Sequence, residues 1–249
     1  MKKLLTRLGQ VLQSLYSNEE VTPDQLVVRL GITYKINSTT PFTGSSVDYH
    51  DNGQMSSGGK YKDGKRHGFF ESFDKDGKQE GLWESYYENG QLEEKGNFKD
   101  GELDGHHEWF YENGQLWKRG NYKDGKLDGL WERFHENGQL WWRENFKDGK
   151  YDGLEEWFYE NGQLSWRKNY KDGELDGLDE GFYENGQLEY RTTYKDGKED
   201  GLQEGFYGNG QLRIRGNIKD GKRDGLWEEF NEDGKLTKTE TYKDGELVE

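Results

Sequence analysis

The sequence contains no cysteine, no alanine, only two prolines and no long hydrophobic run. Without cysteine the chain can form no disulfide and no thiolate metal site, and its redox compartment stays undetermined. No stretch reaches the roughly 20 apolar residues that a membrane-spanning helix needs. Hydrophobic residues make up 29% of the 249 residues, which is too few for the aliphatic core of an ordinary globular domain.

Charge, glycine and aromatic residues dominate instead. Charged residues make up 34% of the chain, the formal net charge is −15 and there are 36 glycines. Such a composition usually indicates disorder. The 15% aromatic content and a strict periodicity argue for a folded repeat. The acidic balance disfavours nucleic acid and anionic membranes as partners, and it favours a basic protein.

Residues 1–25 differ from the remainder. Leucine and valine recur at helical spacing from Leu4 to Leu15, which predicts a short amphipathic helix followed by a linker that ends at Pro23. This helix could cap the first strands, bind a surface or be a degenerate export signal. In the absence of a convincing export signal we expect a cytoplasmic protein, with export to the cell envelope as the alternative.

Residues 26–43 alternate weakly and predict one or two entry strands before a repeat array over residues 44–249. In that array two kinds of glycine turn recur, Asn-Gly and Asp-Gly, exemplified by Asn113-Gly114 and Asp124-Gly125. Both dipeptides suit a two-residue type I′ hairpin turn. The sequence therefore predicts an all-β protein, an elongated antiparallel β-meander of 24-residue, two-strand repeats. The Asn-Gly series, which ends in the equivalent Asp233-Gly234, has glycines 24 residues apart, at Gly90, Gly114, Gly138, Gly162, Gly186, Gly210 and Gly234.

Two departures from the regular pattern predict local differences in the sheet. The glycines Gly64, Gly77 and Gly90 are each 13 residues apart, so one short strand segment is missing between them. The Asn-Gly turn at Gly53 should therefore lie on the opposite edge of the sheet from those at Gly90 and beyond. The second Asp-Gly of each repeat, such as Asp128-Gly129, falls inside a strand and predicts a bulge or bend.

Side-chain alternation predicts two different faces. One face carries leucine and aromatic residues, as in Leu130 and Phe134 on the longer strand and Leu116 and Tyr122 on the shorter. It also carries a strip of seven carboxylates. We expect these to pair with lysine or arginine on neighbouring strands or with the turns, or else to form an acidic strip for a basic partner. The strip consists of Glu84, Glu108, Glu132, Glu156, Glu180, Glu204 and Glu228.

The other face is predicted to combine tryptophan, tyrosine and arginine, the residues that dominate interface hot spots. It is either a recognition surface or a set of cross-strand stacks that stiffen the sheet. Its tyrosines are Tyr111, Tyr159, Tyr183 and Tyr207. The candidate partner-binding residues are Trp109, Trp117, Trp131, Trp141, Trp157, Arg119, Arg143 and Arg167.

The residues give little support to catalysis, a metal or a cofactor. The five histidines occupy non-equivalent repeat positions, and His106 and His107 should point to opposite faces of one strand. The repeated aspartates are explained by turn chemistry and lack the spacing of a calcium-binding β-roll. We expect a protein that is not an enzyme, with no cofactor and no metal.

The repeated units, such as Glu112–Gln115 followed by Gly120–Glu132, closely resemble the bacterial variant of the membrane occupation and recognition nexus (MORN) repeat. The resemblance covers about residues 31–249 and includes the entry motif Thr39–Gly44. Repeats of this kind occur in antitoxin-like partners of secreted toxins. The segment Gly64–Gly68, which contains His67, also resembles a step of the eukaryotic repeat. In the other units of this chain an aspartate stands in place of that histidine. The resemblance implies a scaffold or binding protein with no catalytic residues to carry over.

We therefore expect a protein-binding repeat scaffold, of the antitoxin or immunity type, that neutralises a basic toxin domain. A carbohydrate or cell-surface binding module is the alternative, because aromatic platforms suit both. Self-association into a homo-oligomer is a further option. The sequence does not choose between the two faces.

Overall fold

The computed structural model describes residues 19–248 and divides into two compact units after Gly125. These described residues form strands and one 3-10 turn, with no α-helix. None of their helical segments is long and apolar enough to cross a membrane. The amphipathic helix expected at the N-terminus falls on residues 1–18, outside the described residues.

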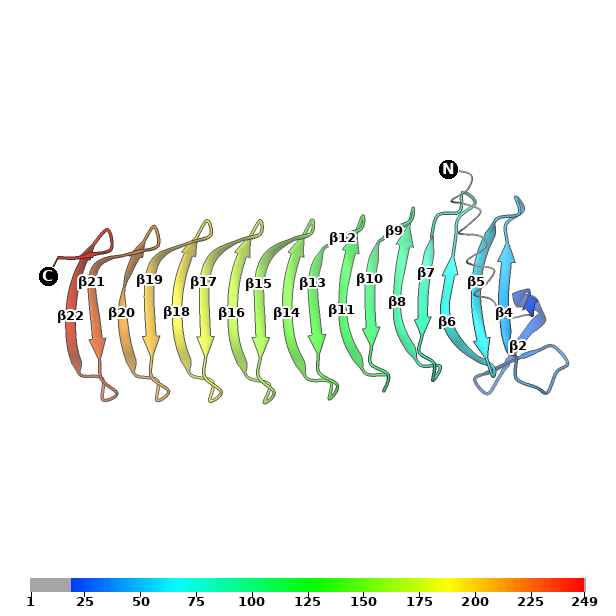
Figure 1. The fold of residues 1–249 in the computed structure, drawn as a ribbon, viewed down its shortest axis with the longest axis horizontal. Helices are drawn as coiled ribbons and strands as arrows, with labels where there is room; N and C mark the ends of the chain where they lie inside the picture. Colours follow the sequence, from blue (N-terminus) through cyan, green and yellow to red (C-terminus); the bar gives the residue numbers. More distant parts are fainter. Residues whose placement is uncertain (1–18, 249) are drawn as a thin grey trace. The chain divides into compact units, whose positions relative to one another are not determined.

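The first unit consists of short strands joined by tight turns. Its elements are β1 (Glu20–Val21), η1 (Pro23–Gln25), β2 (Leu26–Arg29), β3 (Ile32–Lys35), β4 (Gly44–Tyr49), β5 (Met55–Lys62), β6 (Lys65–Ser72), β7 (Gly81–Tyr86), β8 (Leu92–Lys99), β9 (Glu102–Leu103), β10 (Gly105–Phe110) and β11 (Leu116–Lys123). From β4 onward the strands run up and down in chain order (Figure 1). Strands β2 and β3 form a separate hairpin. Strand β1 pairs in parallel with β4, so the expected linker is wrong at Glu20–Val21.

The second unit continues the same up-and-down order. Its elements are β12 (Lys126–Leu127), β13 (Gly129–Phe134), β14 (Leu140–Lys147), β15 (Lys150–Phe158), β16 (Leu164–Lys171), β17 (Glu174–Phe182), β18 (Leu188–Lys195), β19 (Lys198–Phe206), β20 (Leu212–Lys219), β21 (Lys222–Phe230), β22 (Leu236–Lys243) and β23 (Glu246–Leu247). From β13 to β23 each strand is antiparallel to the next (Figure 1). The predicted antiparallel meander is confirmed within each unit.

The two kinds of reversal have different geometries. Asp124 and Gly125 have φ angles of 48° and 71°, as the expected type I′ turn requires. At Asn113-Gly114 only the glycine has a positive φ, and the Gly114 N–H donates to the Tyr111 carbonyl at 2.8 Å. This is a longer turn closed by a glycine bulge, so the two-residue turn expected there is wrong. The Asn113 side chain favours it by accepting a hydrogen bond from the Gln115 N–H at 2.9 Å.

The structure places the turn at Gly53 and the turn at Gly90 on opposite edges of the first unit. The first follows β4 and the second follows β7, and three antiparallel steps separate these strands (Figure 1). The Asn52 side chain donates to the Lys75 carbonyl at 2.7 Å, which joins the Gly53 turn to the next turn on its own edge. The expected placement of these two turns on opposite edges is confirmed, so the β4–β5 hairpin is inverted relative to the later ones.

A bulge interrupts each longer strand at its Asp-Gly. In the second unit Glu144 lies opposite Glu155 and Phe146 lies opposite Tyr151. Residues 152–154 therefore stand opposite one residue, with Gly153 at a φ of 112°. The bend expected at Asp128-Gly129 takes the same form, because it separates β12 from β13.

Tyrosine hydroxyls join successive Asn-Gly turns. Tyr159 donates to the Phe182 carbonyl at 2.7 Å, and Tyr183 donates to the Phe206 carbonyl at 2.9 Å. Tyr207 makes the same bond to the next repeat. These tyrosines were expected to contribute to the recognition face. In the structure they are turn residues that fasten one repeat to the next.

The variant Tyr183→Phe should lower the free energy of unfolding by about 1 kcal/mol, because the Phe206 carbonyl loses its hydrogen bond. The measurement is urea unfolding followed by tryptophan fluorescence. Tyr34→Phe is the matched control, since the Tyr34 hydroxyl bonds to no other described residue. Equal losses in the two variants would contradict the role of the turn hydroxyls.

Candidate binding surfaces

The strand register brings the repeated glutamates and arginines to one face. Glu156 lies opposite both Arg143 and Arg167, and Glu180 lies opposite Arg167 and Arg191. Residues directly opposite each other on neighbouring strands share a face. We call this side of each unit the charged face. It carries Arg66, Glu84, Lys95, Glu108 and Arg119 in the first unit, and Glu132, Arg143, Glu156, Arg167, Glu180, Arg191, Glu204, Arg215 and Glu228 in the second.

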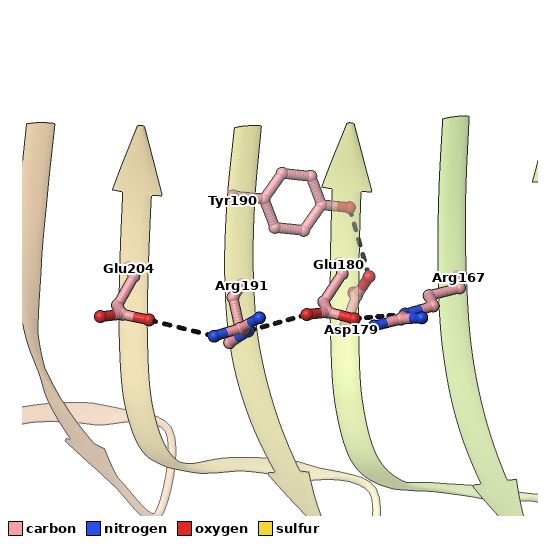
Figure 2. A network of polar contacts seen from close by, with 6 residues as sticks. All are labelled: Arg167, Asp179, Glu180, Tyr190, Arg191 and Glu204. Atoms are coloured by element: carbon pink, nitrogen blue, oxygen red, sulfur yellow. Dashed lines mark hydrogen bonds and ion pairs between the residues drawn. The ribbon is translucent and has the colours of Figure 1, made fainter. Parts of the chain in front are cut away.

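Opposite charges alternate along this face as a ladder of ion pairs. Glu180 is fully buried, and it accepts hydrogen bonds from the Nε atoms of Arg167 and Arg191, the latter at 2.7 Å (Figure 2). Arg191 also reaches Glu204 at 3.6 Å. In the first unit Arg66 pairs with Glu84, and Lys95 pairs with Glu108. The expected pairing with neighbouring cations is confirmed, and it neutralises much of the strip's charge.

The ladder favours the ionised form of Glu180. Burial works to raise the pKa of Glu180, but the hydrogen bonds from Arg167 and Arg191 outweigh it and lower the pKa. Three of the arginines also lie over the phenylalanine two residues beyond their glutamate: Arg143 over Phe158, Arg167 over Phe182 at 5.7 Å, and Arg215 over Phe230. One cation thus contacts both the glutamate and the aromatic residue of the neighbouring strand.

The opposite side, the aromatic face, collects the tryptophans. In the second unit the Trp157 ring centroid lies 5.5 Å from Trp141, 6.0 Å from Trp142 and 6.3 Å from Trp166. Trp131 is only 4% exposed and packs against Phe146. Cross-strand packing therefore accounts for part of this face. Trp142 and Trp166 were not among the predicted residues, although the doublet Trp141-Trp142 is visible in the sequence.

In the first unit the predicted tryptophans contact a cation and a histidine. The Trp109 ring stacks on His107 with centroids 4.0 Å apart. The Lys118 ammonium lies 3.6 Å from the Trp109 centroid and 5.5 Å from that of Trp117. Trp117 is 38% exposed. Of the five predicted tryptophans, Trp109 and Trp117 thus share the Lys118 cation and Trp141 contacts Trp157, whereas Trp131 packs against Phe146.

The arginines expected beside these tryptophans lie on the other face. Arg119, Arg143 and Arg167 belong to the charged face, so their assignment to the aromatic face was wrong. The cause is a bulge at the start of each shorter strand. Trp141 is the extra residue there, and both it and Trp142 contact Trp157, so alternation restarts one residue later.

The same one-residue shift places the aromatic residue of each shorter strand on the aromatic face. Tyr122 and its equivalents were expected to share the face of the repeated glutamates. Phe146, the equivalent in the second unit, contacts Trp131 on the aromatic face instead. In the first unit the Tyr122 ring lies 5.7 Å from that of His107.

Two buried carboxyl groups interrupt the aromatic face of the second unit. Glu144 lies directly opposite Glu155. Glu155 accepts hydrogen bonds from the indole N–H groups of Trp142 and Trp157, at 3.2 and 3.0 Å. The Oε2 atom of Glu144 is buried without a partner among the described residues. Burial, with a contribution from Glu155, raises the pKa of Glu144 to about 7.

A second polar pair follows along the same face. The Lys168 ammonium lies 3.6 Å from Asp179, and the Tyr190 hydroxyl donates to Asp179 at 3.2 Å (Figure 2). Burial raises the pKa of Asp179. Within residues 19–248 no three histidine or acidic side chains converge as metal ligands would.

Glu144 should make stability depend on pH. Its pKa of about 7 in the folded state exceeds the ordinary 4.5, so the folded protein binds a proton that the unfolded chain releases. The free energy of unfolding should therefore fall as pH rises from 4.5 to about 7. Glu144→Gln should remove that fall and stabilise the protein at pH 8 by on the order of 2 kcal/mol.

The measurement is urea unfolding at pH 5 and pH 8 for both proteins. Glu136→Gln, at an exposed position on the neighbouring turn, is the control and should leave the pH dependence unchanged. An unaltered pH dependence in Glu144→Gln would show that this carboxyl group does not titrate as described.

Comparison with known proteins agrees with the repeat geometry. A family model described as the MORN repeat variant matches residues 79–100, 103–124, 127–148, 151–172, 175–196, 199–220 and 223–244. No curated protein matches the chain. Among solved structures, a mutant form of the Photorhabdus luminescens Tc holotoxin pore aligns at 11% identity, over 85% of this chain and 15% of that chain, with a TM-score of 0.14. That score is too low to inform the fold. The seven matches cover more than half of the sequence, and the chain therefore belongs to the MORN repeat variant family.

Proposed function

We propose that this protein is a non-enzymatic scaffold whose second unit binds a basic protein domain on its charged face. More specifically, we propose that it is an antitoxin or immunity protein that neutralises a toxin domain. Membership of a repeat family supports the scaffold part. The resemblance of the repeats to those of antitoxin-like proteins supports the finer part.

A row of exposed leucines on the charged face carries the proposal. One leucine stands at the same position of each longer strand, two residues before the ladder glutamate, and each is between 40% and 52% exposed. Aligned apolar side chains that remain in contact with water are typical of an interaction surface. This leucine row consists of Leu130, Leu154, Leu178, Leu202 and Leu226.

The leucine row has the spacing and surroundings of a docking surface. Leu154 lies opposite Asn169 and Leu178 opposite Thr193, so a small polar residue separates successive leucines. Leucines recur on every second strand, which places them about 10 Å apart. A hollow of about 310 Å³ lies between Leu154 and Leu178, lined also by Arg167, Asn169 and Glu180. An apolar centre with a rim of paired charges is the usual anatomy of a protein interface.

The charge of the chain selects a basic partner. The ladder charges are largely paired within the sheet, so the excess of acid is carried by exposed turn residues such as Asp148 and Glu160. The net charge of −15 would steer a cationic domain towards the protein and speed its association. A face that repeats the same chemistry along the chain suits a broad protein surface better than a single substrate.

Replacing two members of the leucine row should abolish tight binding. In the double variant Leu178→Asp and Leu202→Asp, two carboxylates would be buried against the partner. We expect the dissociation constant to rise by roughly 30-fold or more, the effect of losing one interface hot spot. The measurement is calorimetric titration against the purified product of the neighbouring gene.

Val28→Asp is the matched control. Val28 is also highly exposed, at 65%, but it lies on the separate β2–β3 hairpin, so this variant should bind like the unaltered protein. Unchanged affinity in the double leucine variant would rule out the leucine row as the binding surface. Failure of the neighbouring gene product to bind the unaltered protein would remove the proposed antitoxin pairing.

A further inference from the structure

A cavity of about 430 Å³ opens on the charged face of the first unit, where the repeat array begins. Strands β4 to β7 supply most of its walls, and Pro23 of η1 closes one side. Its volume falls within the range of small-molecule binding sites. It lies entirely in the first unit, apart from the leucine row of the second.

The cavity exists because small residues replace large ones. Aligned on the turn glycine, Ser57 and Gly58 of β5 stand where β14 carries Trp142 and Arg143. The inverted first hairpin also places Ser46 and Gly59 on the same side as Phe70 and Glu84, as the register across β4 to β7 shows. A Cβ atom on Gly59 would lie 2.1 Å from the Phe70 ring. Glycine is therefore needed for that ring to form the floor.

Hydroxyl groups that bond to no other residue within 19–248 converge on this cavity. The side chains of Ser46, Ser57, Ser72 and Tyr61 line it, and none of these hydroxyls bonds to another described residue. Each can both donate and accept a hydrogen bond. The structure thus offers four adaptable hydroxyls around one aromatic ring.

Two charged side chains face this cavity, and they compensate each other. Arg66 pairs with Glu84 and donates to the Tyr86 hydroxyl at 2.9 Å. Glu71 lies opposite Gly58 and next to Phe70 in β6, so its side chain belongs to the other face of the sheet. There it accepts a hydrogen bond from the Gln79 amide at 2.9 Å, and burial raises its pKa. The compensated arginine makes a free anion a poor occupant.

We propose that this cavity binds one neutral monosaccharide unit, either free or at the end of a glycan. Sugar hydroxyls would meet the three serines and Tyr61. The sugar would lie above the floor formed by Phe70, beside the Arg66 guanidinium, which lies 4.7 Å from the centre of that ring. This activity does not depend on the protein-binding role of the second unit.

The test uses the full chain and saturation-transfer NMR with glucose, galactose and N-acetylglucosamine as probes, and with glutamine as a zwitterion of similar size. Saturation transfer to at least one sugar is expected. Ser57→Leu should weaken that binding at least about tenfold by filling the cavity, and Ser72→Ala should weaken it about threefold by removing one hydroxyl. Ser56→Leu, at the neighbouring position of the same strand and outside the cavity lining, should bind like the unaltered protein.

Three outcomes would overturn the proposal: no transfer to any of the sugars, tighter binding of glutamine than of every sugar, or unchanged sugar affinity in both Ser57→Leu and Ser72→Ala. The alanine variant decides the matter if the leucine variant does not fold, because it removes only one half-buried oxygen. Circular dichroism of each variant identifies loss of the fold.

Discussion

Most ladder glutamates stand between cations from the two neighbouring strands, and this alternation of charge is the constraint on which the sheet depends. The described strands of the second unit form a single layer, yet Glu180 is completely buried. Such a carboxylate is tolerable only when hydrogen-bonded cations compensate it, as Arg167 and Arg191 do. A slip of one residue in register would turn every ladder side chain to the other face. The charges therefore specify the pairing of the strands as well as stabilising it.

With the register fixed by the ladder, the other side chains can vary and give each region a different surface. Tryptophan fills the aromatic face where a glycine on the next strand leaves room, as at Trp227 over Gly216, where an added Cβ would lie 2.2 Å from the ring. The buried pair Glu144 and Glu155 replaces that packing in the middle of the second unit. Leucines remain exposed beside the ladder, and serine and glycine open a cavity at its start. One repeated backbone thus carries three chemically distinct surfaces.

The features that could be predicted from the sequence are those set by local chemistry. Glycine turns, the meander and the inverted first hairpin follow from φ preferences and spacing, and ion pairing of the glutamates follows from like-charge repulsion. The faces of Arg119, Arg143 and Arg167 could not be predicted, because a one-residue bulge at positions such as Trp141 shifts the alternation and leaves no clear signal in the sequence. The parallel pairing of Glu20–Val21 with β4 depends on contacts between distant segments. The candidate cavity depends on the same kind of long-range arrangement.

A double-mutant cycle between Arg167 and Glu180 tests the central role of the ladder most directly. Urea unfolding of Arg167→Met, Glu180→Gln and the double variant gives the coupling energy, and the exposed pair Lys238 and Glu240, at 2.7 Å, serves as the reference cycle. The account predicts a coupling of about 1–3 kcal/mol between Arg167 and Glu180, well above that of the reference pair. Additive effects of the two substitutions would contradict it, because the sheet would then be held by something other than its alternating charges.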